Sequence, residues 1–187
     1  MCPRLRCRGI SLIEVVIFIV VVAIGFTALF LLQSNVVRGT VDPLVRKQAV
    51  ALATSLMEEI QLRGFTYCDP DDANVHTATS AGGCTTAEGL GLEAGESHAT
   101  RSTLDNVSDY SGIPAMSGAG ITDISGASIA GLAGYSVAIG VANIAGGELP
   151  QLTDNTDGLK ITVTVTGPAG VSVALEGYRL RYAPNSP

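Results

Sequence analysis

Residues 10–32 read ISLIEVVIFIVVVAIGFTALFLL, a run of 23 residues whose only polar members are Ser11, Glu14 and Thr27. An α-helix of this length, rising about 1.5 Å per residue, spans roughly 35 Å, which is enough to cross the hydrocarbon core of a membrane. The run is too long for the apolar region of an ordinary signal peptide, and no small-residue cleavage site follows it. It therefore predicts a transmembrane helix.

The charges before this run predict its orientation. Three arginines, Arg4, Arg6 and Arg8, precede it, and no acidic residue accompanies them. Basic residues stay on the cytoplasmic side of a membrane, so we expect a single pass with the N-terminus in the cytoplasm and the residues after Leu32 outside.

Glu14 does not fit a plain membrane anchor. A charged side chain costs about 2.5–3.5 kcal/mol at the centre of a membrane and less near its edge. Glu14 lies near the cytoplasmic end of the run, so one interpretation is that it reaches the interface. The other is that it has a charged partner and a function.

The residues around Glu14 favour the second interpretation. The sequence GISLIE at 9–14 resembles the cleavage and methylation site of type IV prepilins, in which a short basic leader ends in glycine and precedes a long apolar helix with glutamate near its start. The resemblance implies that a prepilin peptidase cuts after Gly9 and methylates the new N-terminus at Ile10. It also implies that Glu14 neutralises the α-amino group of Ile10 in a neighbouring pilin subunit. Two features depart from the commoner pattern: Ile10 replaces phenylalanine, and no proline interrupts the run.

Removal of the leader, residues 1–9, changes the charge and the cysteine count. Three of the eleven basic residues are lost, so eight remain against seventeen acidic residues and the net charge moves from −6 to −9. Only Cys68 and Cys84 remain of the four cysteines. Two cysteines in an oxidising periplasm predict one disulfide.

A second, amphipathic helix is expected within residues 33–64. Apolar residues recur there at intervals of three and four, which is the period of one helix face. Asp42-Pro43 predicts a kink or a new helix start, Glu59 and Arg63 predict an ion pair one turn apart, and Gly64 predicts the end. The stripe consists of Val41, Val45, Ala49, Leu52, Leu56 and Ile60.

Residues 65–187 are expected to form a globular periplasmic domain, which begins with loops up to about residue 120. The acidic sequence DPDD at 69–72 suggests calcium, but it lacks the spacing, the central glycine and the distal glutamate of an EF-hand loop, so a solvated turn is favoured. The segment RSTLDNVSDYSG at 101–112 is similar to a segment of D-type minor pilins from the mannose-sensitive haemagglutinin pilus.

The last third of the chain predicts antiparallel strands. Residues 129–145 are short for a second membrane span and show a period of two, and residues 160–166 alternate threonine with Ile and Val. A turn is expected at 167–170, and a change of phase predicts a β-bulge at Glu176-Gly177 in the last strand. The expected fold class is α+β, a long N-terminal helix packed on a C-terminal antiparallel sheet, as in pilins.

No catalytic motif supports an enzyme, and His76 and His98 lie in Gly/Ser/Thr-rich surroundings typical of loops. We expect no cofactor and no metal, and the acidic net charge argues against nucleic acid as a partner. The expected function is that of a minor pilin that takes part in type IV pilus assembly, located in the bacterial inner membrane and then in the pilus. A pseudopilin of a type II secretion system, or an uncleaved single-pass protein with a periplasmic binding domain, are the alternatives.

Overall fold

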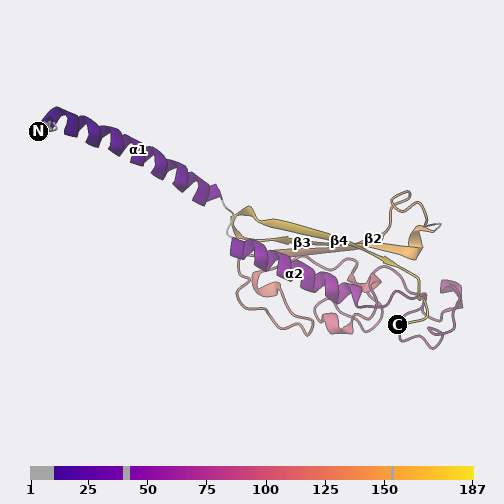
Figure 1. Ribbon diagram of the computed structural model, residues 1–187. Helices are drawn as coiled ribbons and strands as arrows, with labels where there is room; N and C mark the ends of the chain where they lie inside the picture. The colour runs from indigo at the N-terminus through magenta and orange to yellow at the C-terminus, as the bar shows by residue number, and fades with distance from the viewer. Residues whose placement is uncertain (1–10, 40–42, 153) are drawn as a thin grey trace, which may run out of the picture. The chain divides into compact units, whose positions relative to one another are not determined.

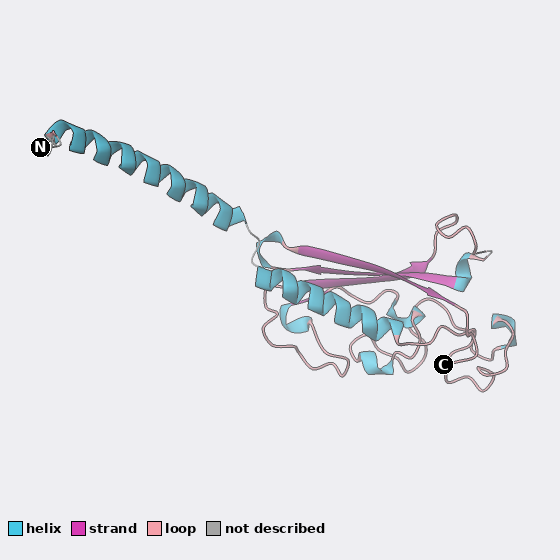
Figure 2. Ribbon diagram, viewed as in Figure 1, coloured by secondary structure: helices cyan, strands magenta, loops and turns pink. Residues whose placement is uncertain are grey.

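The computed structural model describes residues 11–39, 43–152 and 154–187. The chain divides into two compact units, Met1–Val41 and Asp42–Pro187, which are described separately. Figure 1 labels the main elements, and Figure 2 colours them by type.

The described residues of the first unit form one helix, α1, from Leu12 to Gly39. Its segment Leu12–Phe30 is long and apolar enough to cross a membrane, and none of it is buried within the structure. Apolar side chains are exposed all around this segment, as Phe18 at 67% and Phe30 at 68% illustrate. The hydroxyl of Thr27 donates to the carbonyl of Ala23 at 2.6 Å, so this polar group is satisfied within the helix.

The second unit begins with α2, from Pro43 to Gln61. Proline at the first helical position suits a helix start, because that position needs no N–H donor. Val41 and Asp42, the start of the expected stripe and the expected cap, lie outside the described residues. Further along α2 one face is buried, and it consists of Ala49, Ala53, Leu56, Met57 and Ile60.

Four strands form one antiparallel sheet in the order β1-β2-β3-β4. The expected alternation is confirmed in β2 and β3, since Val137, Ile139, Ile161 and Val163 are buried and the intervening residues are more exposed. The strands are β1 (Met116–Ser117), β2 (Ser136–Asn143), β3 (Gly158–Thr166) and β4 (Ser172–Leu180).

The main core joins α2, the inner face of the sheet and the segment between them, residues 62–135, which we call the loop layer. Figure 2 shows these loops on the same side of the sheet as α2. Leu104, Val107 and Tyr110 of the loop layer are fully buried in this core. Short 3₁₀ helices punctuate the loops, at η1 (Ala81–Gly83), η2 (Arg101–Thr103), η3 (Ser108–Tyr110), η4 (Gly118–Gly120), η5 (Asn155–Asp157) and η6 (Pro168–Gly170).

The β-bulge expected at Glu176-Gly177 is wrong. Strand β4 pairs with β3 residue by residue from Thr166↔Ser172 to Gly158↔Leu180, without an insertion. Gly177 takes an inner position, where an added Cβ would lie 2.6 Å from Gln61 Nε2 and 3.1 Å from Met57 Sδ. Side chains of α2 fill that space, so Tyr178 stays on the outer face, and its hydroxyl donates to Glu148 Oε1 at 2.7 Å.

The expected disulfide is present in the loop layer. Cys68 and Cys84 are bonded with a Cα–Cα distance of 5.3 Å, and Cys68 forms a small second core with Val75 and Ala78. Asn185 Nδ2 donates to the carbonyls of Val75 and Ala78, both at 2.8 Å. The C-terminal residues are therefore fastened to the loop that the disulfide closes.

The register of β3 and β4 predicts different costs for two truncations of large aliphatic side chains. Ile161 is fully buried at the centre of the inner face, whereas Leu180 on the outer face is 42% exposed. We expect Ile161→Ala to lower the free energy of unfolding by about 2–5 kcal/mol and Leu180→Ala to lower it by less than about 1.5 kcal/mol. Denaturant unfolding of the full chain in detergent measures both values. Equal losses would contradict the continuous register.

Candidate functional site

The residues expected at the cleavage junction lie at the start of the chain. Arg4, Arg6, Arg8, Gly9 and Ile10 fall outside the described residues. Glu14 is described, and it lies exposed in the first turn of α1, where its N–H donates to the carbonyl of Ser11 at 3.0 Å. The structure therefore places one acidic side chain at the N-terminal end of an otherwise apolar helix.

In the second unit, a buried ion pair joins α2 to the loop layer. Arg101 is only 1% exposed, and its Nε and Nη2 donate to Glu59 Oε1 and Oε2 at 2.7 and 3.2 Å. Its Nη1 and Nη2 also donate to Thr122 Oγ1 and the Thr122 carbonyl, at 3.1 and 3.0 Å. This two-pronged geometry satisfies both groups, which is what makes a buried guanidinium tolerable.

Glu59 has a further partner in Tyr110, whose hydroxyl donates to Oε1 at 3.0 Å. Burial and the neighbouring Glu59 carboxylate raise the pKa of Tyr110 above its usual range. The expected pair between Glu59 and Arg63 is wrong, because the loop layer brings Arg101 to the same carboxylate. Arg63 instead points its Nη2 toward the Arg101 carbonyl, at 3.5 Å.

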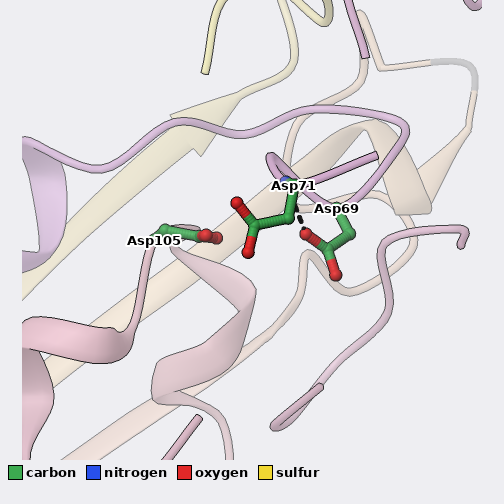
Figure 3. A group of neighbouring side chains, drawn as sticks. All are labelled: Asp69, Asp71 and Asp105. Atoms are coloured by element: carbon green, nitrogen blue, oxygen red, sulfur yellow. Dashed lines mark hydrogen bonds between the residues drawn. The ribbon is translucent and has the colours of Figure 1, made fainter. Parts of the chain in front are cut away.

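Acidic side chains gather elsewhere in the loop layer, in three groups that share members. Figure 3 shows the first group, Asp69, Asp71 and Asp105, in which the N–H of Asp71 donates to Asp69 Oδ1 at 2.7 Å. In each group, one carboxylate oxygen per residue lies within 4.8 Å of the others. The other two groups are Glu96, Asp105 and Asp109, and Glu88, Glu93 and Asp109.

Asp109 is the most buried member of this acidic cluster, with no exposed surface. Its Oδ2 accepts from the N–H groups of Asp105 and Asn106, at 2.9 and 2.6 Å. Glu88 is held through Oε1, which accepts from the hydroxyl of Ser108 at 2.6 Å. These bonds hold the two carboxylates in place within the loop layer.

The pKa values of four carboxyl groups, those of Glu88, Glu93, Asp105 and Asp109, are raised, because burial penalises the charged form and like charges lie nearby. Burial raises the pKa of Asp109 to about 9, assisted by the charge of Glu88. It raises the pKa of Glu88 and of Glu93 to about 7 and that of Asp105 to about 6. These four carboxyl groups therefore bind a proton at higher pH than ordinary surface carboxylates do.

The stretch 69–72 forms turns, as expected, but not all of it is solvated. Asp72 is 8% exposed, and its two oxygens accept from the N–H groups of Asn74 and Thr86 at 2.7 and 2.5 Å. These backbone hydrogen bonds hold the pKa of Asp72 below its usual value. Its carboxylate stabilises the loop that the disulfide closes.

Two further sequence features acquire a structural role. The segment 101–112 contributes Arg101, Leu104 and Tyr110 to the interior. His76 is exposed as expected, whereas His98 is half-buried and its Nε2 lies 2.8 Å from the carbonyl of Asp109. The sequence reasoning missed Glu88, Glu93 and Asp109 as a group, because they come from separate turns of the loop layer.

Comparisons of the chain with protein-family models, with curated proteins and with solved structures found no match.

Removal of the buried guanidinium should strongly destabilise the second unit. We expect Arg101→Met to cost about 3–5 kcal/mol in the free energy of unfolding, because it leaves the Glu59 carboxylate without its cation. Adding Glu59→Gln should recover part of that loss, so a double-mutant cycle in denaturant will be non-additive. Lys160→Met, which breaks exposed pairs to Glu148 and Glu176, serves as control and should cost less. Additive losses would contradict the coupling.

The acidic cluster predicts how stability depends on pH when a chelator is present. The folded-state pKa values of Glu88 and Asp109, about 7 and 9, lie above the unfolded values of 4.5 and 3.8. The folded state therefore binds more protons between these limits, and the free energy of unfolding should fall as pH rises from about 5 to 9. Asp109→Asn, which does not titrate, should flatten the profile. Urea unfolding with EDTA at several pH values measures it, and a rising profile would contradict the expectation.

Proposed function

We propose that this chain is a minor-pilin-like subunit that assembles into a type IV pilus through its N-terminal helix. The observation that carries the proposal is the helix segment Leu12–Phe30, which is apolar on every side and has Glu14 in its first turn. A separately folded α+β unit, Asp42–Pro187, follows it. The helix is thus the membrane and assembly element, and the folded unit is the part displayed outside.

The exposed apolar surface of α1 supports this division of roles. Such a helix is stable in lipid, where its side chains face hydrocarbon and its backbone is internally hydrogen-bonded. When a subunit leaves the membrane, the same surface must be covered by other apolar helices, because its exposure to water is costly. Packing against the helices of neighbouring subunits provides that cover.

Glu14 fixes the axial register between the packed helices of neighbouring subunits. A lone carboxylate among apolar helices is costly, and so is a lone α-amino group. Cleavage after Gly9 creates such an amino group at Ile10, and pairing it with Glu14 of the next subunit offsets both costs. The arginines of the leader hold the uncleaved junction at the cytoplasmic face, where prepilin peptidase acts.

The resemblance at residues 101–112 supports the finer assignment to a pilus of the mannose-sensitive haemagglutinin type. A minor pseudopilin of a type II secretion system shares the same N-terminal requirements, and neighbouring genes distinguish the two. An uncleaved single-pass protein with a periplasmic binding domain differs in a testable way, because it has no need of Gly9.

The first test follows processing. Gly9→Phe should abolish cleavage, so the variant keeps its full length in strains with and without prepilin peptidase, whereas the wild type becomes shorter only when the peptidase is present. Gly25→Phe is the matched control, because Gly25 has nothing within 4 Å and lies away from the junction. Gel mobility and the mass of the N-terminal peptide, methylated at Ile10, report the result. A wild-type chain of unchanged size in both strains would refute the proposal.

A second test separates cleavage from assembly. Glu14→Gln should still be cleaved but should lose most of its incorporation into sheared pili, because the α-amino group of the neighbour has no charge partner. Glu58→Gln, which changes an exposed carboxylate on α2, should be incorporated like the wild type. Immunoblots of sheared pili and of membranes measure both fractions, and equal incorporation of the two variants would contradict the role of Glu14.

A further inference from the structure

We propose that the loop layer binds one Ca²⁺ ion, with Glu88, Glu93 and Asp109 as its protein ligands. The site lies wholly within the second unit and uses no residue of α1. The proposal therefore stands apart from the proposed assembly function, and each can fail without the other.

Two unsatisfied oxygens point to a bound ion. Glu88 Oε2 and Asp109 Oδ1 are buried and have no hydrogen-bond partner in the part of the chain that the structure describes. The second oxygen of each carboxylate is already satisfied, by Ser108 and by the N–H groups of Asp105 and Asn106 respectively. A buried carboxylate oxygen without a partner is costly, so either a bound cation or a shared proton must lie between these two side chains, and we assign the position to a cation.

The spacing of the ligands suits Ca²⁺. One oxygen from each of Glu88, Glu93 and Asp109 lies within 4.8 Å of the others. An ion can therefore lie within about 2.8 Å of all three oxygens, so a small inward movement of the side chains brings them to the Ca–O distance of about 2.3–2.6 Å. Mg²⁺ binds at about 2.0–2.1 Å in strict octahedral geometry, and it would require the carboxylates to draw closer still. The all-carboxylate donor set also favours a hard cation over zinc.

The surrounding charge favours a cation as well. Glu96 and Asp105 lie next to Asp109 and add negative charge there. Asp69 and Asp71 lie next to Asp105 in turn (Figure 3). Two arginines act electrostatically on the cluster, but both have other partners. Arg63 reaches the Arg101 carbonyl at 3.5 Å. Arg181 stacks on the Phe65 ring at 4.1 Å and pairs through Nη1 with Asp157 at 3.4 Å, while its buried Nε has no hydrogen-bond partner among the described residues.

The ligands are held before the ion arrives. Asn106 donates from Nδ2 to Thr66 Oγ1 at 2.8 Å, which fixes the turn whose N–H groups hold Asp109. Glu88 also lines a cavity of about 130 Å³, which has room for water molecules beside this ligand. A preorganised site of this kind loses little conformational entropy when the ion binds.

The experiment compares thermal unfolding of the full chain in detergent at neutral pH with EDTA, with Ca²⁺ and with Mg²⁺. For a Kd of about 10⁻⁴ M, typical of extracellular modules, about 1 mM Ca²⁺ shifts the folding equilibrium roughly elevenfold. The expected rise in Tm is about 3–6 °C, with a smaller rise in Mg²⁺. Isothermal titration with CaCl₂ should give one site per chain.

Charge-removing variants of similar shape test the ligands. Asp109→Asn and Glu88→Gln should unfold cooperatively in EDTA and lose the Ca²⁺-dependent rise in Tm. Glu58→Gln, an exposed carboxylate outside the cluster, should keep it. Glu93→Gln changes a half-buried ligand and provides the readout if the Asp109 variant does not fold.

Two results would overturn the proposal. One is a wild-type Tm that is the same in Ca²⁺ and in EDTA, which would assign the buried Glu88–Asp109 pair to a shared proton. The other is a full Ca²⁺ response in both Asp109→Asn and Glu88→Gln, which would place any bound calcium elsewhere on the chain.

Discussion

The neutralisation of Arg101 by Glu59 is the interaction on which the globular unit depends. A guanidinium with 1% of its surface exposed is tolerable only when each of its donors has an acceptor. Glu59 supplies two of those acceptors from α2, and Thr122 supplies two more from the far end of the loop layer. The pair therefore fixes the position of the long, irregular loops on α2. Without it, the loops would contact only the apolar stripe of that helix.

The same short segment that contains Arg101 also carries two members of the acidic cluster. Arg101 faces α2, while Asp105 and Asp109, four and eight residues later, meet acidic side chains of other turns. Tyr110 connects the two regions, because it directly follows Asp109 and donates to Glu59. Anchoring this segment to the helix thus also positions the carboxylates. An apolar replacement for Arg101 could fill the space but would not fix the segment in the same way.

Short-range patterns predicted the parts of the fold that depend on periodicity. The helix of the apolar run follows from its length and composition, and the stripe on α2 and the alternation in β3 follow from the one face of each element that is buried. The predicted change of phase in β4 was wrong, because the side chain of Met57 occupies the space that a side chain at position 177 would need. Met57 lies on α2, 120 positions before Gly177. The Arg101–Glu59 pair spans 42 positions, and no local rule couples them. The acidic cluster escaped prediction for the same reason, since its members come together only through irregular turns.

The hydrogen bonds between Asn185 and the loop that the Cys68–Cys84 disulfide closes affect when the domain can complete its fold. The last residues of the chain must dock onto a loop whose shape a disulfide maintains. In a reducing compartment that loop is open, so the chain end has no firm surface to meet. Completion of the fold is thereby tied to the redox state of the surroundings, and the folded unit becomes fully consolidated only in an oxidising compartment.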